Sequence, residues 1–190
     1  MKKVRFNFKG QFHRACAKDG LRPVMCYIHF KDGYAYATDS MVLVRSRLQE
    51  HCSVIDAANL NGHALHRDSF AQIIKYSNAQ ATEGGVKCWD SGGKEAFFPY
   101  ADLTGLKIPD FEFVLSDIKP TEASVRCLNP ALIDIASKCL VRAKGEGLVF
   151  IHQDLGRGVV VVPEGCYEAS QMCIIMPRMI DAETYIEIVK

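Results

Sequence analysis

The chain has 190 residues, of which 48% are hydrophobic and 24% are charged. This composition is ordinary for a globular protein and excludes a disordered chain, and the length allows one large domain or two small ones. The formal net charge is +1, so a nucleic-acid partner would require basic groups gathered on one face. No apolar run approaches the ~20 residues that cross a bilayer. The basic N-terminus lacks the apolar core of a signal peptide, so we expect a cytoplasmic protein with no membrane partner.

The eight cysteines are many for this length. No pair has Cys-x-x-Cys spacing, and none flanks a histidine at the spacing of zinc ligands, so we expect no metal site. Several lie within apolar stretches, which favours small buried side chains in a reducing compartment. The sequence also lacks a dinucleotide fingerprint, a phosphate-binding glycine loop and the motifs of serine hydrolases and zinc proteases. We therefore expect no catalytic residues, no enzyme activity and no cofactor.

The first part of the chain predicts a strand, a helix and an antiparallel meander. Residues 4–8 alternate apolar and polar side chains, as a half-buried strand does. Residues 11–19 place Phe12, Ala15 and Cys16 on one helical face, and Gly20 ends that helix. Three strands follow over residues 25–30, 34–38 and 41–48, the first two joined by an Asp32-Gly33 turn.

The same order recurs in the middle of the chain. A short strand over 62–67 precedes a helix over 68–75, with Asp68 as its N-cap. A hairpin then spans residues 86–89 and 95–100, and residues 111–115 predict one more strand.

The third copy is the clearest. Residues 124–128 predict a strand, and a helix begins at Pro130 with Asn129 as its cap. Strands follow over residues 148–152, 158–162 and 172–176, the first two joined by a turn at 154–156.

The chain thus contains three copies of a strand–helix–meander unit. This pattern predicts an α+β fold in which helices cover one face of antiparallel sheets. Pro109 and Pro120 flank the expected boundary between the second and third units. We divide the chain into residues 1–118, which hold two units, and residues 119–190, which hold one unit and a C-terminal tail.

Three stretches, in this order, resemble the bacterial sliding clamp, the β subunit of DNA polymerase III. They are GLRPVMCYIHFKDGYAYATDSMVLVRSRL at residues 20–48, HALHRDSFAQIIKYSNA with the Trp89 hairpin and KIPDFEF, and LNPALIDIASKCL through CIIMPRMI. The resemblance implies the DNA-clamp fold and a shortened chain of about one and a half clamp domains. It departs from the family at the terminal segment, where Arg178 and Met179 exchange places, and in the extra tail over residues 181–190.

A sliding clamp encircles duplex DNA and tethers a polymerase, and the resemblance implies that function here. Family rings hold twelve such units, so four copies of this chain would form a homo-oligomeric ring through pairing of exposed end strands from the first and third units. The implied partners are double-stranded DNA, a DNA polymerase and a clamp loader. The alternative is a clamp-fold binding module, or decoy, that binds replication proteins without encircling DNA.

Two sets of site residues follow. Cations concentrate on the predicted helices and their loops, where a clamp contacts phosphates, although any exposed helix face carries such residues. The expected DNA-binding residues are Lys9, Arg14, Lys18, Arg22, Lys75, Lys138, Arg142 and Lys144. The resemblance implies that a groove for partner peptides is bordered by Met176, Pro177, Arg178 and Met179.

Overall fold

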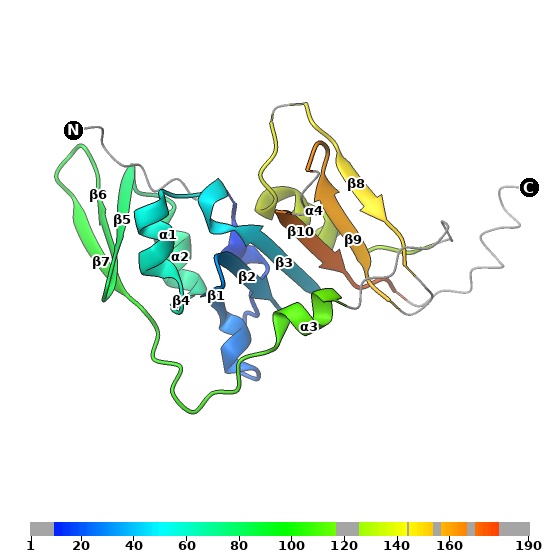
Figure 1. Cartoon of the computed structure of the whole chain (residues 1–190), viewed down its shortest axis with the longest axis horizontal. Coiled ribbons are helices and arrows are strands. Elements are labelled where there is room, and N and C mark those ends of the chain that lie inside the picture. Colours follow the sequence, from blue (N-terminus) through cyan, green and yellow to red (C-terminus); the bar gives the residue numbers. More distant parts are fainter. Residues whose placement is uncertain (1–9, 117–125, 144, 154–156, 167–169, 179–190) are drawn as a thin grey trace, which may run out of the picture.

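Two antiparallel sheets organise the chain in the computed structural model (Figure 1). The structure describes residues 10–116, 126–143, 145–153, 157–166 and 170–178. The large sheet has seven strands in the order β4-β1-β2-β3-β10-β9-β8, and the small sheet has three in the order β5-β6-β7. Figure 1 shows two short helices, α1 and α2, between the sheets. Within the described residues, no helix is long and apolar enough to span a membrane.

The first unit forms the meander that the sequence predicts. Its strands are β1 (Tyr27–Lys31), β2 (Tyr34–Thr38) and β3 (Val42–Arg47). Asp32 and Gly33, between β1 and β2, have φ angles of 52° and 80°, which suit the left-handed turn of a tight hairpin. The strand expected over residues 4–8 lies outside the described residues.

The helix predicted over residues 11–19 is wrong in extent. Only the 3₁₀ turns η1 (Phe12–Arg14) and η2 (Pro23–Cys26) form in this region. Other elements take the backbone groups that a longer helix would use: the Gln11 amide donates to the Lys138 carbonyl (3.0 Å) and the Ala17 amide to the Met25 carbonyl (2.9 Å). The expected apolar face is nevertheless correct, because Phe12, Ala15 and Cys16 are buried.

The second unit contains β4 (Ala64–His66), α2 (Arg67–Ile73), β5 (Asn78–Thr82), β6 (Gly85–Trp89) and β7 (Glu95–Pro99). Its helix begins earlier than predicted, because the His66 ring, not Asp68, provides the N-cap by accepting the Asp68 amide. Three elements were not predicted from the sequence: β5, the 3₁₀ turn η3 (Leu48–Glu50) and α1 (Val54–Leu60). The Ser53 side chain caps α1 by accepting the Asp56 amide.

The segment at residues 111–115 is a helix, α3 (Phe111–Ser116), and the predicted strand is wrong. The Asp110 carboxylate accepts the Phe113 amide (3.0 Å) at the start of this helix. Phe111 and Leu115 are one helical turn apart and both are buried. Phe111 stacks on Tyr36 of β2, with ring centroids 4.8 Å apart.

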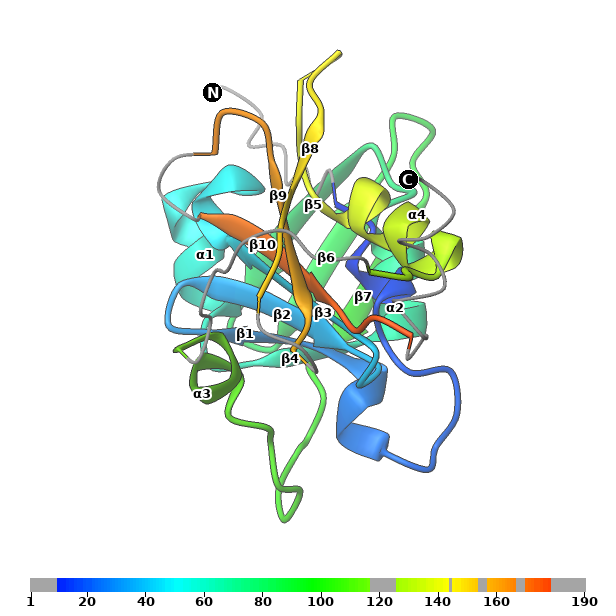
Figure 2. The same ribbon diagram turned by 90° about the vertical axis from the view of Figure 1, so that its right-hand side faces the viewer.

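Helix α3 also corrects the expectation that all helices share one face. Side chains alternate between the faces of a strand: Val42 and Val44 join the main core, whereas Tyr36 and Leu43 join a second cluster with α3. Figure 2 shows α3 and α4 on opposite sides of the large sheet. The large sheet is therefore covered on both faces.

The third unit contains α4 (Pro130–Cys139), β8 (Leu148–Ile151), β9 (Val159–Pro163) and β10 (Gln171–Ile175). The predicted start of α4 is confirmed, since the Asn129 side chain accepts the Ala131 amide (3.0 Å) ahead of Pro130. Cys127, from the strand expected over 124–128, forms an isolated bridge with Arg178. Most of that strand and the turn at 154–156 lie outside the described residues.

Strand β10 pairs with β3, with Cys173 opposite Val44, so the first and third units share one sheet within the chain. Since β3 pairs with β10 and β1 pairs with β4, no strand of the first unit among the described residues has an open edge for pairing with another copy. The prediction that the cysteines are small buried side chains is confirmed at five positions, Cys16, Cys26, Cys88, Cys139 and Cys173, and all eight thiols are free.

Candidate nucleic-acid interface

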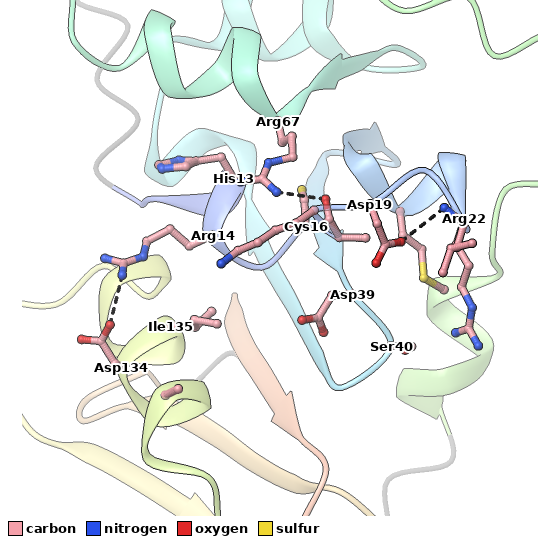
Figure 3. A pocket seen from close by; sticks show the side chains of 15 residues that line it. His13, Arg14, Cys16, Asp19, Arg22, Asp39, Ser40, Arg67, Asp134 and Ile135 are labelled. Carbon is pink, nitrogen blue, oxygen red and sulfur yellow. Dashed lines mark hydrogen bonds and ion pairs between the residues drawn. The ribbon is translucent and has the colours of Figure 1, made fainter.

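A cleft of about 730 Å³ opens where the segment from η1 to η2, the turn between β2 and β3, the start of α2 and the first turns of α4 meet (Figure 3). Three of the predicted DNA-binding residues, Arg14, Lys18 and Arg22, line it together. Four cationic side chains face three carboxylates in its walls: Arg14, Lys18, Arg22 and Arg67 against Asp19, Asp39 and Asp134. The cleft thus has a modest excess of positive charge.

Arg14 and Lys138, both predicted DNA contacts, meet at one acid. The Arg14 guanidinium lies 3.2 Å from Asp134 and the Lys138 ammonium lies 2.8 Å from it. The hydrogen bond from Lys138, with the charge of Arg14 beyond it, lowers the pKa of the Asp134 carboxyl. All three side chains are between 35% and 48% exposed, so they are ordered by the pairs yet open to solvent.

Arg67 holds the loop that carries Lys18 in place. Its guanidinium donates to the Ala17 carbonyl (3.2 Å), and its Nε lies 3.4 Å from Asp68. The sequence predicts Arg67 at the end of the strand before the second helix, and the structure places it in the first turn of α2, but nothing local shows that its side chain reaches residue 17. This side chain therefore builds the cleft from a position fifty residues away.

Lys18 and Arg22 are the most accessible cations of the cleft. Both are exposed, and within the described part of the chain neither makes an ion pair or a side-chain hydrogen bond. The pKa of nearby His13 is lowered mainly by burial and, to a smaller extent, by the positive charges of Arg14, Arg67 and Lys75. The predicted contact Lys75 is thus close enough to add to the positive potential of this region.

The other predicted cations are placed apart from the cleft or beyond the described residues. Arg142 shares a separate hollow of about 430 Å³ with Lys138. It donates to the Glu146 carbonyl (2.6 Å) and to the Ser137 hydroxyl (2.8 Å). Lys9 and Lys144 lie outside the described residues.

Acidification is expected to lower the free energy of unfolding between pH 7.5 and 5.5. Burial depresses the pKa of both His13 and His29, although the Val24 carbonyl, which the His29 ring contacts at 2.7 Å, opposes the shift at His29. An unfolded histidine titrates near pH ~6.5, so the unfolded chain binds more protons and gains stability relative to the fold as the pH falls. Urea midpoints across this range measure the effect. His29→Asn should reduce the dependence of the urea midpoint on pH. An unchanged pH dependence in that variant would contradict the contribution assigned to His29.

The residues expected to border a peptide groove follow β10. The Met176 amide donates to the Met41 carbonyl (3.0 Å) and the Arg178 amide to the Cys127 carbonyl (2.8 Å), which fixes the backbone on both sides of Pro177. Met172 is buried in the second cluster and is a core residue. Arg178 is exposed, and Met41, whose carbonyl accepts the Met176 amide, is 50% exposed. Met179 lies outside the described residues.

No group of three or more His, Cys, Asp or Glu side chains in the described ranges is arranged to hold a metal ion. The candidate site is the cleft, whose walls are helical segments and the turn between β2 and β3.

Comparison with known proteins identifies the fold. No protein-family model matches the chain, and no curated protein matches it. The sliding clamp of Bacillus subtilis superimposes with a TM-score of 0.59 at 14% identity, covering 94% of this chain and 64% of that one. The DNA polymerase III subunit beta of Bartonella birtlesii gives a TM-score of 0.57 at 13% identity, covering 90% and 63%.

A Pseudomonas aeruginosa sliding clamp gives a TM-score of 0.51 at 12% identity, covering 91% of this chain and 65% of that one. The chain has the fold of the bacterial DNA polymerase sliding clamps, as the resemblance implied, and spans about 64% of the length of the first of these structures. At such identity the likeness establishes the fold alone.

Proposed function

We propose that this protein is a sliding-clamp-like accessory factor of DNA replication that encircles duplex DNA as a homo-oligomeric ring and tethers a polymerase. The observation that carries the proposal is the convergence of Arg14, Lys18, Arg22 and Arg67 in one cleft. Phosphate contacts of this kind hold a duplex without reading its bases. A clamp needs no catalytic residue, because it acts by topology.

The open sheet edges support the proposed ring closure. Within the described residues, β7 pairs only with β6, and β8 pairs only with β9. The edge of β5 is capped, because Asp56 accepts the Ala81 amide (2.8 Å) and Asn59 donates to the Ala81 carbonyl (2.9 Å). The edge of β4 is also occupied in part, because its Ala64 carbonyl accepts the Ala101 amide (2.9 Å).

Strands β7 and β8 are therefore the edges that we assign to contacts between copies. Pairing of β7 of one copy with β8 of the next is a head-to-tail contact, which closes into a ring if the rotation allows. Four copies supply the twelve units of a clamp ring. A polymerase or clamp loader would then bind beside Met176, Pro177 and the exposed Met41.

Phe97→Pro tests the ring. Phe97 lies in β7 opposite Lys87 and is 55% exposed. The backbone bonds of the flanking pairs, Asp90 with Lys94 and Tyr100 with Gly84, leave the Phe97 amide facing away from β6, so a proline there removes an amide from the open edge of the sheet. Native mass spectrometry should show a tetramer for the parent chain and a monomer for this variant. Val54→Pro is the matched control, because Val54 is 70% exposed at the first position of α1, where proline is tolerated.

Topological binding is tested on nicked circular DNA. A ring loaded spontaneously or by a loader should stay on the circle in high salt and leave when the DNA is cut to a linear form. Only monomer at high concentration would overturn the ring. Binding to clamp-motif peptides with no affinity for DNA at low salt would support the decoy function instead.

A further inference from the structure

Two ion pairs at the cleft converge on a single acid. Asp134 accepts Lys138 from its own helix, one turn away, and Arg14 from the η1 segment, which is remote in sequence. Figure 3 shows the Arg14 and Asp134 side chains pointing toward one another at the mouth of the cleft. Two of the cations expected to contact phosphates are thus already paired with one carboxylate.

The other two acids of the cleft serve the backbone. The Asp39 carboxylate accepts the amides of Met41 (2.9 Å) and Val42 (3.0 Å). The Asp19 carboxylate accepts the Leu21 amide (3.2 Å). Both acids shape turns, so Asp134 alone among the three carboxylates binds the cleft's cations.

We propose that Asp134 is an internal substitute for a DNA phosphate, which Arg14 and Lys138 exchange for phosphodiester groups when duplex DNA enters the cleft. This inference rests on the proposed function, and it adds that Asp134 regulates how tightly the cleft binds DNA. A carboxylate and a phosphate offer similar acceptor oxygens to a guanidinium. An internal competitor keeps the two cations in position while it weakens each phosphate contact, which suits a protein that must slide.

Asp134→Asn is expected to tighten binding to a fluorescent duplex by about 10-fold at low salt. In the parent complex Asp134 competes with phosphate and holds each cation for part of the time. Each cation that the variant frees fully for phosphate adds up to about 0.9 to the slope of log affinity against log salt, so the slope should steepen by up to about 2. Asp134→Glu keeps the carboxylate and should behave as the parent chain. Asp32→Asn makes the same charge change in the β1–β2 turn, at the other end of β2 from the cleft, and should leave affinity unchanged apart from a small uniform shift.

The salt slope distinguishes this role from a purely structural ion pair between the first and third units. A structural pair would lower the urea midpoint of Asp134→Asn without changing the slope, and that result would overturn the inference. Parent-level affinity in Asp134→Asn, with binding still lost in a Lys18→Glu/Arg22→Glu variant, would overturn it and leave the proposed function intact. Absence of duplex binding by the parent chain and all variants would overturn both.

Discussion

Replacing Lys18 and Arg22 together by glutamate is expected to reduce the affinity for duplex DNA by at least about 100-fold at low salt. Both side chains are exposed at the cleft, and Arg67 holds the Lys18 loop through the Ala17 carbonyl. Each lost phosphate contact removes about 0.9 from the salt slope, and each new carboxylate repels phosphate. Fluorescence anisotropy at several salt concentrations measures affinity and slope together.

The control for this pair is Lys31→Glu/Lys107→Glu. Lys31 ends β1 beside Asp32, and Lys107 lies in the exposed segment before α3. The double change alters the net charge by the same amount but leaves the cleft intact. Equal losses in the two variants would show that total charge, not the cleft, governs binding, and would contradict the proposed interface.

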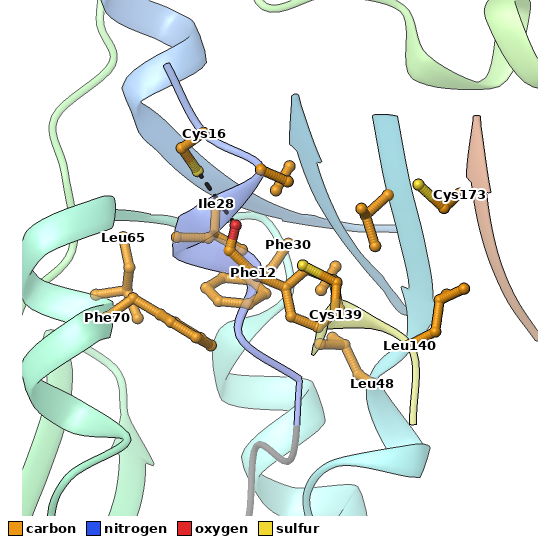
Figure 4. Close-up of a cluster of buried hydrophobic side chains, with 14 of the residues drawn as sticks. Phe12, Cys16, Ile28, Phe30, Leu48, Leu65, Phe70, Cys139, Leu140 and Cys173 are labelled. Atoms are coloured by element: carbon orange, nitrogen blue, oxygen red, sulfur yellow. Dashed lines mark hydrogen bonds between the residues drawn. The ribbon is translucent and has the colours of Figure 1, made fainter. Parts of the chain in front are cut away.

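Phe12→Ala is expected to lower the free energy of unfolding by about 3–5 kcal/mol, the usual cost of a large cavity in a core. Phe12 is fully buried where η1 meets α2, the η3 turn and α4 (Figure 4). Its ring makes edge contacts with Phe70 and His51, at centroid distances of 6.2 and 5.5 Å. Urea denaturation followed by circular dichroism gives the free energy.

Phe113→Ala is the matched control, because it removes the same atoms from a side chain that is 73% exposed on α3. Exposed substitutions away from caps and networks change stability by about 0.5 kcal/mol or less. If the two variants were equally destabilised, Phe12 would not be the centre of the core that the structure shows.

The sequence predicted those parts of the fold that local chemistry decides. Asp32-Gly33 specifies a tight turn by its backbone preferences, and Asn129-Pro130 specifies a helix start through a cap and a missing amide. Both are where the sequence places them. The repeated order of strand, helix and meander also follows from local patterns. Three stretches in this order carry the resemblance to the sliding clamps, whose fold the chain has.

The remaining errors have tertiary causes. An apolar run such as Phe111–Leu115 suits a buried strand or a buried helix equally. The helix forms because Asp110 caps its start and because Phe111 and Leu115 cover apolar side chains of β2 and β3. Residues 15–19 leave the helical path because Met25 and Arg67 bind the Ala17 backbone. For the same reason, charge patterns found Arg14, Lys18 and Arg22, but not the function of Arg67 or the convergence on Asp134.

The pairing of β3 with β10 has a consequence for biosynthesis. Strand β3 ends at Arg47, whereas its neighbour β10 begins at Gln171, so the ribosome must add the 123 residues from 48 to 170 and then β10 itself before this seam can close. Until then, the nascent first unit displays an unpaired strand edge with Val42 and Val44 beside it, a surface on which chains aggregate. Productive folding in the cell therefore depends on the arrival of a late segment, and chaperones that shield emerging strands should raise the yield.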